Sequence, residues 1–211
     1  GILAARMAYA QHFDEKELNR ALRNAHTEII LLAGTFKIFS QTRKINLEEI
    51  KNSKLEIIGS EQLSSRQKKE MLDIFSRNRP HYAPQLLKTV TVEFQEALAA
   101  GGRKFYLFSY AGKLVSFMSF DDLPNGNLYA GSLNVRPEIK GSAIGGAMLK
   151  AALEREGRER VVEAVVYEKN PMMRHYINDF GFKITEEIPD YQGTGEKFYK
   201  LERPPSRPAT P

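Results

Sequence analysis

The sequence predicts an α/β fold of the α+β kind, in which helices and strands alternate from about Lys54 onwards. Apolar residues at helical spacing predict helices over 64–77 and 85–100. Short runs rich in β-branched and aromatic residues predict strands at 55–58, 104–110, 113–121, 128–135 and 160–167. With 42% hydrophobic residues in a chain of 211, the protein can bury one sizeable core.

The boundaries of these elements follow from residues that start or stop regular structure. Ser64 or Ser65 is the expected cap of the first helix, and Gly101-Gly102 ends the second. Ala111-Gly112 joins two strands as a hairpin, and Asp122 to Gly126 forms the next turn. Later segments are a helix that ends at Gly157, a short helix with a proline in its first turn, and two closing strands, at 144–156, 171–180, 183–187 and 197–201.

The chain divides into three parts. Residues 1–54 are expected to form a helical extension of unknown role, because Leu18, Ala21, Leu22, Ala25 and Ile29 recur at helical spacing. Residues 55–203 carry the regular alternation. Residues 204–211 are rich in proline, and we expect a disordered tail.

Composition excludes several classes of function. The chain has no cysteine, so disulfide scaffolds, cysteine nucleophiles and thiolate metal sites are absent, and its four histidines lack the spacing of a zinc site. We therefore expect no metal. No apolar run is long enough to span a bilayer and no signal peptide is visible, so a cytoplasmic location is predicted. The net charge of +5 is scattered among acids, and a nucleic-acid role is not indicated.

Residues 133–149 form the most informative stretch, because an apolar strand passes through a glycine-rich turn directly into a helix. The start of a helix leaves backbone N–H groups unpaired, and its dipole favours negative charge. Gly141 and Gly145 would let a phosphate approach the main chain. The junction therefore predicts a phosphorylated cofactor, although glycines in a tight turn can also serve packing alone.

The order of strand, glycine-rich turn, helix and strand, followed by Asn170 and Phe180-Gly181-Phe182, resembles the GNAT superfamily of acyl-CoA-dependent N-acyltransferases. The pyrophosphate turn of the family is usually written (Arg/Gln)-x-x-Gly-x-(Gly/Ala). Residues 140–145 match this motif with two substitutions, Lys140 in place of Arg or Gln and Ala143 in place of Gly. The resemblance implies a mostly antiparallel central sheet with helices on both faces. It also implies a V-shaped splay between the fourth and fifth strands.

The resemblance further implies acetyl-CoA as co-substrate and a set of residues that hold it. Main-chain groups of Leu133, Asn134 and Val135 would bind the pantetheine arm and polarise the thioester carbonyl. The pyrophosphate would lie on Lys140, Gly141, Ser142, Ala143, Ile144 and Gly145, with Asn170 beside the pantetheine. An amine then attacks the acyl group directly, so the partners are an acyl-CoA and an amine acceptor, either a small molecule or a protein. A homodimer is left open.

The catalytic acid departs from the family pattern. Members commonly place a tyrosine four residues before the glycine of the Gly-Phe ending, and Ile177 stands at that position. Tyr176 is adjacent, and one residue rotates a helical side chain by about 100°. Tyr176 therefore either packs against the sheet or, if the helix starts one residue out of register, serves as the acid. Glu163 and Tyr129 are further candidates for catalysis by side-chain type. The alternative for each is a structural or solvent-facing role.

Acceptor specificity in the family is shaped by the loop between the first two helices and by the turn after the third strand. His81 and Tyr82 in the first loop, and Asp121 and Asp122 at the turn, are the candidate substrate-binding residues. Two neighbouring carboxylates would favour a cationic amine. The alternative to an enzyme is a catalytically weak or inactive GNAT-like domain that binds acyl-CoA or another protein, which Ile177 motivates.

Overall fold

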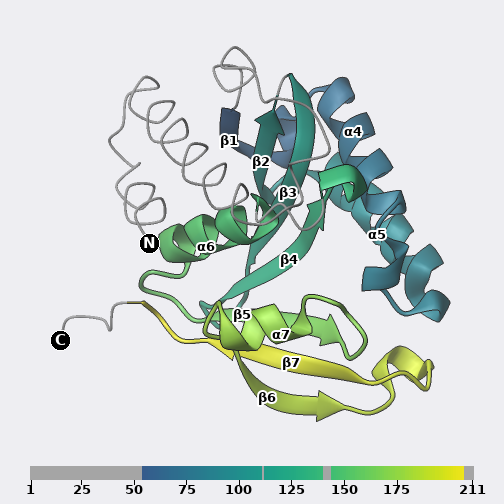
Figure 1. Cartoon of the computed structure of the whole chain (residues 1–211), viewed down its shortest axis with the longest axis vertical. Coiled ribbons are helices and arrows are strands. Elements are labelled where there is room, and N and C mark those ends of the chain that lie inside the picture. Colours follow the sequence, from purple (N-terminus) through teal and green to yellow (C-terminus); the bar gives the residue numbers. More distant parts are fainter. Residues whose placement is uncertain (1–53, 111, 140–143, 207–211) are drawn as a thin grey trace, which may run out of the picture.

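A seven-stranded sheet forms the centre of the molecule in the computed structural model, which describes residues 54–110, 112–139 and 144–206 (Figure 1). The strands lie in the order β1-β2-β3-β4-β5-β7-β6. All neighbouring pairs are antiparallel except β4 with β5. Their bounds are β1 Lys54–Gly59, β2 Lys104–Tyr110, β3 Lys113–Asp122, β4 Leu128–Val135, β5 Val162–Tyr167, β6 Lys183–Ile188 and β7 Phe198–Arg203. The predicted mixed, mostly antiparallel sheet is confirmed.

Helices cover both faces of this sheet. Figure 1 shows α4 and α5 on one side and α6 on the other, with α7 lying over the β5–β7 half. The four helices are α4 Ser65–Ser76, α5 Leu87–Ala100, α6 Ile144–Glu156 and α7 Met173–Asn178. Ser64 caps α4 through a reciprocal pair of hydrogen bonds with Gln67, as its place before the apolar repeat predicts.

The alternation of side chains along the strands separates two cores. On β2, Tyr106 and Phe108 face α6, whereas Phe105 and Leu107 face α4 and α5. The α6 core also holds Met148 and Ala152, which the helical spacing predicts to be buried. The sheet is therefore an apolar layer packed on both faces, and this packing fixes the relative positions of the residues described below.

The two halves of the sheet separate between β4 and β5. These parallel strands pair at two positions, Leu128 with Val162 and Tyr129 with Glu163, although both strands continue beyond them. On its other edge β4 pairs with β3 as far as Val135. One edge of β4 therefore carries backbone groups that β5 does not engage, and the expected V-shaped splay is confirmed.

Most predicted element boundaries differ from the observed ones by one or two residues, as at the starts of α5, β5 and α7. The prolines of the loop between α4 and α5 form the short 3-10 turns η3 Arg79–His81 and η4 Pro84–Leu86, so α5 starts at Leu87. β5 starts at Val162, and the Arg160 side chain just before it donates hydrogen bonds to the carbonyls of Gly126 and Asn127. α7 starts at Met173, after the Asn170 side chain has accepted a hydrogen bond from the Met172 amide.

The ends of the chain fall largely outside the described residues. The predicted helical extension over 1–54 lies there except for its last residue, as do residues 207–211 of the predicted tail. Ser206 donates its amide to the Gly157 carbonyl at 3.2 Å. Of the helices in the described ranges, none combines the length and the apolar character needed to cross a membrane.

Candidate active site

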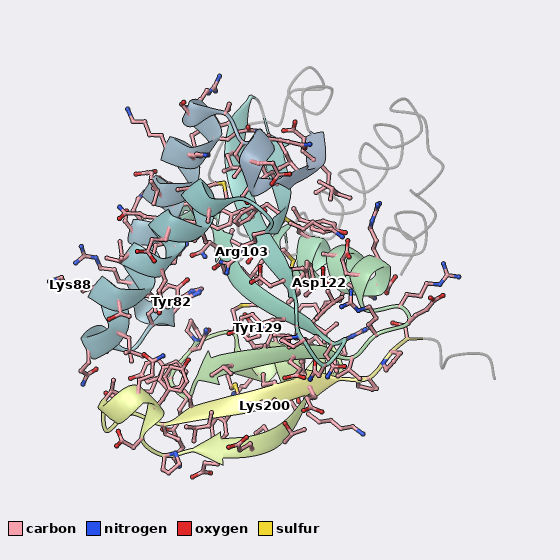
Figure 2. The ribbon with its side chains drawn as sticks, turned by 180° about the vertical axis from the view of Figure 1, so that it is seen from behind. Tyr82, Lys88, Arg103, Asp122, Tyr129 and Lys200 are labelled. Carbon is pink, nitrogen blue, oxygen red and sulfur yellow. The ribbon has the colours of Figure 1, made fainter. Side chains whose placement is uncertain are left out.

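A cavity of about 270 Å³ occupies the opening between β4 and β5. Its floor comes from residues 129–133 of β4 and 164–167 of β5. The loop before α5, α5 itself, α7 and the turn η6 Tyr191–Gly193 close its sides. Figure 2 shows Tyr129 and Arg103 at this opening, with Tyr82 on the side of α5. The splay in the sheet is therefore a lined chamber that reaches the α5 side of the sheet.

β4 bulges where it borders the cavity. The pairing between β3 and β4 shifts register between Phe117 and Ser119, and Ser132 takes a left-handed conformation with φ of 50°. Such a conformation is uncommon for a residue other than glycine and is found at functional sites. The bulge turns the backbone of Ser132 and Leu133 out of the ladder beside the open edge.

Asn134 holds the bulge from within. Its side chain is fully buried, and its amide donates to the Ser132 carbonyl at 3.1 Å and to the Tyr82 hydroxyl at 3.3 Å. Among the described residues, none donates a hydrogen bond to Asn134 Oδ1. Burial raises the pKa of Tyr82 to about 12, so this phenol stays protonated at neutral pH. The loop between α4 and α5 is thereby joined to β4.

Two further tyrosines face this chamber. Tyr129 and Tyr176 both line it, and burial raises the pKa of each. A hydrogen bond to the Val165 backbone opposes the shift of Tyr129, which places its hydroxyl across the start of the splay. Ile177, by contrast, is 37% exposed. The family tyrosine is replaced by Ile177 in this helix, and it is the neighbouring side chain of Tyr176 that lines the cavity.

Glu163 does not line the chamber. Its carboxylate is nearly buried and accepts hydrogen bonds from Asn127 at 2.6 Å and Asn125 at 3.0 Å, while Lys200 Nζ lies 3.0 Å away. The bond from Asn127 is the main cause of a lowered pKa. A carboxylate held in its charged form by three donors is a weak base, so the expectation of a catalytic Glu163 is corrected to a structural role.

The two aspartates at the end of β3 point to different places. Asp121 lines the cavity and accepts a hydrogen bond from Arg103 Nε at 2.8 Å. Asp122 lies outside the cavity lining and pairs with Arg160 at 2.7 Å, with a side chain that is 82% exposed. Figure 2 shows Asp122 away from the opening. The expected pair of carboxylates is therefore replaced by one ion pair, Arg103–Asp121.

The loop before α5 contributes His81 and Tyr82 to the lining, and their predicted contact with a substrate stays a prediction. Asn170 also lines the cavity, and its Nδ2 lies 3.5 Å from the His81 carbonyl oxygen. Asn170 thus connects the loop between α4 and α5 to the start of α7.

The predicted cofactor residues fall in two groups. Leu133 borders the cavity, and Val135 packs on Gly145, where a Cβ atom would lie 2.5 Å from Val135 Cγ2. Gly145 therefore allows the start of α6 to approach β4 closely. Ile144 begins α6, while Lys140, Gly141, Ser142 and Ala143 lie outside the described residues, so their predicted contact with pyrophosphate stays a prediction.

Sequence reasoning missed several residues of the cavity. Ser132 reads as an ordinary strand residue, and Arg103 gave no signal because its partner Asp121 is distant in sequence. Glu93 and Tyr191 reach the lining from α5 and from η6. In the part of the chain that the structure describes, no group of three histidine or acidic side chains is placed to hold a metal ion.

Comparisons with known proteins agree with this architecture. Residues 68–182 match the acetyltransferase (GNAT) family. An acyl-CoA N-acyltransferase from Pseudomonas aeruginosa superposes with a TM-score of 0.56 at 14% identity, over 72% of this chain and 99% of that one. A GNAT-family protein from Desulfovibrio desulfuricans superposes with a TM-score of 0.56 at 15% identity, over 71% of this chain and 98% of that one.

YncA from Salmonella typhimurium, solved with acetyl-CoA, gives a TM-score of 0.55 at 15% identity, over 76% of this chain and 98% of that one. At these identities the likeness concerns the fold. No curated protein matches the sequence.

Proposed function

Because the chain belongs to the GNAT acetyltransferase family, we propose that it transfers an acetyl group from acetyl-CoA to a primary amine by direct attack. The observation that carries the proposal is the chamber of about 270 Å³ in the β4–β5 splay, which a bulged strand and protonated tyrosines line. A cavity that meets both an open strand edge and hydroxyl donors can align two reactants.

The residues present fit an acyl-CoA. The edge of β4 from Ala130 onwards is not paired with β5, so its backbone groups are available to the amides of a pantetheine arm. Gly145 brings α6 against β4 beside this edge. Acetyl-CoA supplies a thioester whose carbonyl carbon accepts an amine. The backbone N–H groups at the Ser132–Leu133 bulge would polarise that carbonyl.

The reaction requires a proton donor for the leaving sulfur and an acceptor for the proton that the amine loses. The amine forms the new C–N bond as the C–S bond breaks, and the leaving sulfur takes a proton from the Tyr176 hydroxyl. Burial raises the Tyr176 pKa, which keeps the hydroxyl protonated at neutral pH but makes it a weaker acid, so its proposed role depends on its position beside the leaving sulfur. The proton that the amine loses passes to water at the mouth of the cavity, and a proton from this water restores the Tyr176 hydroxyl, so that the amine and the thiolate exchange one proton overall.

One observation favours a second candidate, a GNAT-like domain that binds acyl-CoA without turnover. The position where the family commonly has its acid carries Ile177, and that side chain is exposed. Binding and turnover are separable by measurement. The candidate predicts binding of acetyl-CoA without acetyl transfer to any amine.

The test combines binding and turnover in wild type and in Gly141→Glu. Wild type should show thermal stabilisation by acetyl-CoA and amine-dependent release of CoA thiol, and the variant should lose both, because a carboxylate would repel the pyrophosphate. At about 100 times its dissociation constant, acetyl-CoA should add roughly 2.7 kcal/mol.

Stabilisation without release in the presence of any amine would support the binding module. Stabilisation that Gly141→Glu retains would overturn the assigned cofactor site. No stabilisation at millimolar acetyl-CoA would overturn the proposal.

A further inference from the structure

Arg103 is held rigidly at the wall of the cavity on the α5 side. It lies directly before β2, where its amide donates to Ser60 Oγ at 3.2 Å and its carbonyl accepts from the Ser60 amide at 2.9 Å. Its side chain crosses to β3, where Nε donates to Asp121 Oδ1 at 2.8 Å. Backbone and side chain are therefore both fixed before any ligand binds.

The two terminal nitrogens of this guanidinium remain available. In the described ranges of the chain, no residue accepts a hydrogen bond from Nη1 or Nη2 of Arg103. The side chain is nevertheless only 29% exposed, and it lines the cavity. A guanidinium presents its N–H groups as a planar fork that matches a carboxylate in a bidentate contact. A fork anchored at Nε is already oriented for such a contact.

The sheet places this fork close to the opening of the splay. Lys104 pairs with Phe120, so Arg103 lies beside Asp121, and Asp121 pairs with Tyr129 on β4. With strands about 4.8 Å apart, the backbones of Arg103 and Tyr129 are separated by roughly 10 Å. An arginine side chain is long enough to cover much of that span. A carboxylate bound to it would therefore leave a nearby amino group close to the β4–β5 opening.

The remaining walls suit an apolar body. Tyr191 stacks on Phe198 with ring centroids 4.3 Å apart, and Tyr167 lies against the same ring at 5.2 Å. Phe75 and Phe94 add aromatic surface from α4 and α5. Glu93 is the other lining acid on this side, and it is exposed. Arg103, which pairs with Asp121 through Nε, is thus the arginine of the cavity lining, and its Nη1 and Nη2 are the donors left for an anionic group of a ligand.

We propose that Arg103, positioned by Asp121, binds the carboxylate of the acceptor, which makes the acceptor an α-amino acid with an aromatic or aliphatic side chain. The inference rests on the proposed acetyl transfer and names its substrate class. An amine without a carboxylate would displace water from the fork and leave its N–H groups unpaired, which is a strong basis for discrimination.

The test compares matched acceptors at saturating acetyl-CoA. Phenylalanine and phenethylamine differ only in the carboxylate, as do leucine and 3-methylbutylamine. We expect wild type to prefer the amino acids, and Arg103→Gln to lower kcat/KM for them about 10- to 100-fold through KM, as expected for one charge-assisted contact. The carboxylate-free amines should not lose activity in the variant, because they make no such contact and no longer leave the N–H groups of the fork unpaired.

Three further variants sharpen the result. Arg103→Lys keeps the charge but loses the fork, so it should recover only part of the preference. Asp121→Asn should weaken the preference by raising KM for the amino acids, because Arg103 loses the partner that orients it. Arg66→Gln removes an exposed arginine of α4 that pairs with Glu70, and should change nothing. Thermal unfolding of each variant checks that it is folded.

The failures are distinguishable. Equal use of both members of each pair by wild type, or an equal loss on both in Arg103→Gln, would overturn the carboxylate contact while leaving acetyl transfer intact. Preference for phosphoethanolamine over the amino acids would assign the fork to phosphate instead. Absence of CoA release with every amine would overturn the proposed function itself.

Discussion

Tyr176 is the proposed general acid of the reaction. It lines the cavity while its neighbour Ile177 is exposed, so a change of one position decides which side chain meets the leaving sulfur. Replacement by phenylalanine keeps the ring that packs on Phe182 with centroids 6.0 Å apart and removes only the hydroxyl group. We expect Tyr176→Phe to lower kcat about 100-fold, in the range of general acid catalysis, with little change in KM for acetyl-CoA.

The matched control for Tyr176→Phe restores the family tyrosine at the neighbouring position. In the double variant Tyr176→Phe, Ile177→Tyr the new phenol would point to solvent, so steady-state kinetics should show no recovery. Recovery of kcat would show that position 177 faces the reaction and that Tyr176 is a packing residue.

Helix α6 and strand β4 form the element pair that would carry the cofactor. A Cβ atom on Gly145 would lie 2.5 Å from Val135 Cγ2, whereas one on Gly146 would meet Phe180 Cζ at an ordinary 3.6 Å. Because valine is stiff at χ1, Gly145→Ala must push the start of α6 from β4. We expect this variant to lose about 1–3 kcal/mol of unfolding free energy, as overpacked sites do, and to bind acetyl-CoA more weakly.

Gly146→Ala is the control within the same helical turn. It replaces a helical glycine without a clash, so it should keep acetyl-CoA affinity and gain up to about 1 kcal/mol of stability. Urea unfolding and calorimetric titration measure both quantities. Equal effects of the two substitutions would refute the close approach of α6 to β4.

The elements also show how far the sequence could predict this molecule. Strands and helices were predictable because their apolar periods are regular. The bulge at Ser132 was not, since Leu128 to Val135 reads as one continuous strand. The direction of Glu163 was not predictable either, because both faces of β5 are largely covered and its neighbours are apolar on either side. Arg103 and Asp121 meet only through the pairing of β2 with β3, which residue spacing does not reveal.

At the scale of the whole molecule, Glu163 ties together the two halves of the sheet at the closed end of the splay. Its carboxylate accepts from Asn125 and Asn127 of the β3–β4 turn and pairs with Lys200 of β7. β4 and β5 share two backbone pairs there, so this network supplements a short contact. Stability of the molecule should therefore depend on the charge of Glu163.

The sign of the pH dependence follows from the lowered pKa of Glu163. The folded state prefers the carboxylate, so its stabilisation is complete well above the ordinary value of 4.5 and is lost as pH falls through the lower folded value. At pH 7 we expect Glu163→Gln to lower the unfolding free energy by about 1–3 kcal/mol, because the donors lose a charged acceptor. Below pH 4.5 the difference in unfolding free energy between the variant and wild type should become smaller, since the wild-type carboxyl also becomes neutral.

Urea unfolding from pH 8 down to the acid limit of the folded protein would measure this difference. Glu187→Gln is the control, because Glu187 pairs with Lys197 at 3.1 Å through a side chain that is 53% exposed. An exposed pair of this kind contributes about 0–1 kcal/mol, so the control should follow wild type at every pH. A Glu163→Gln variant as stable as wild type at pH 7, or a deficit that does not change with pH, would show that packing around β5 holds the halves together without the carboxylate.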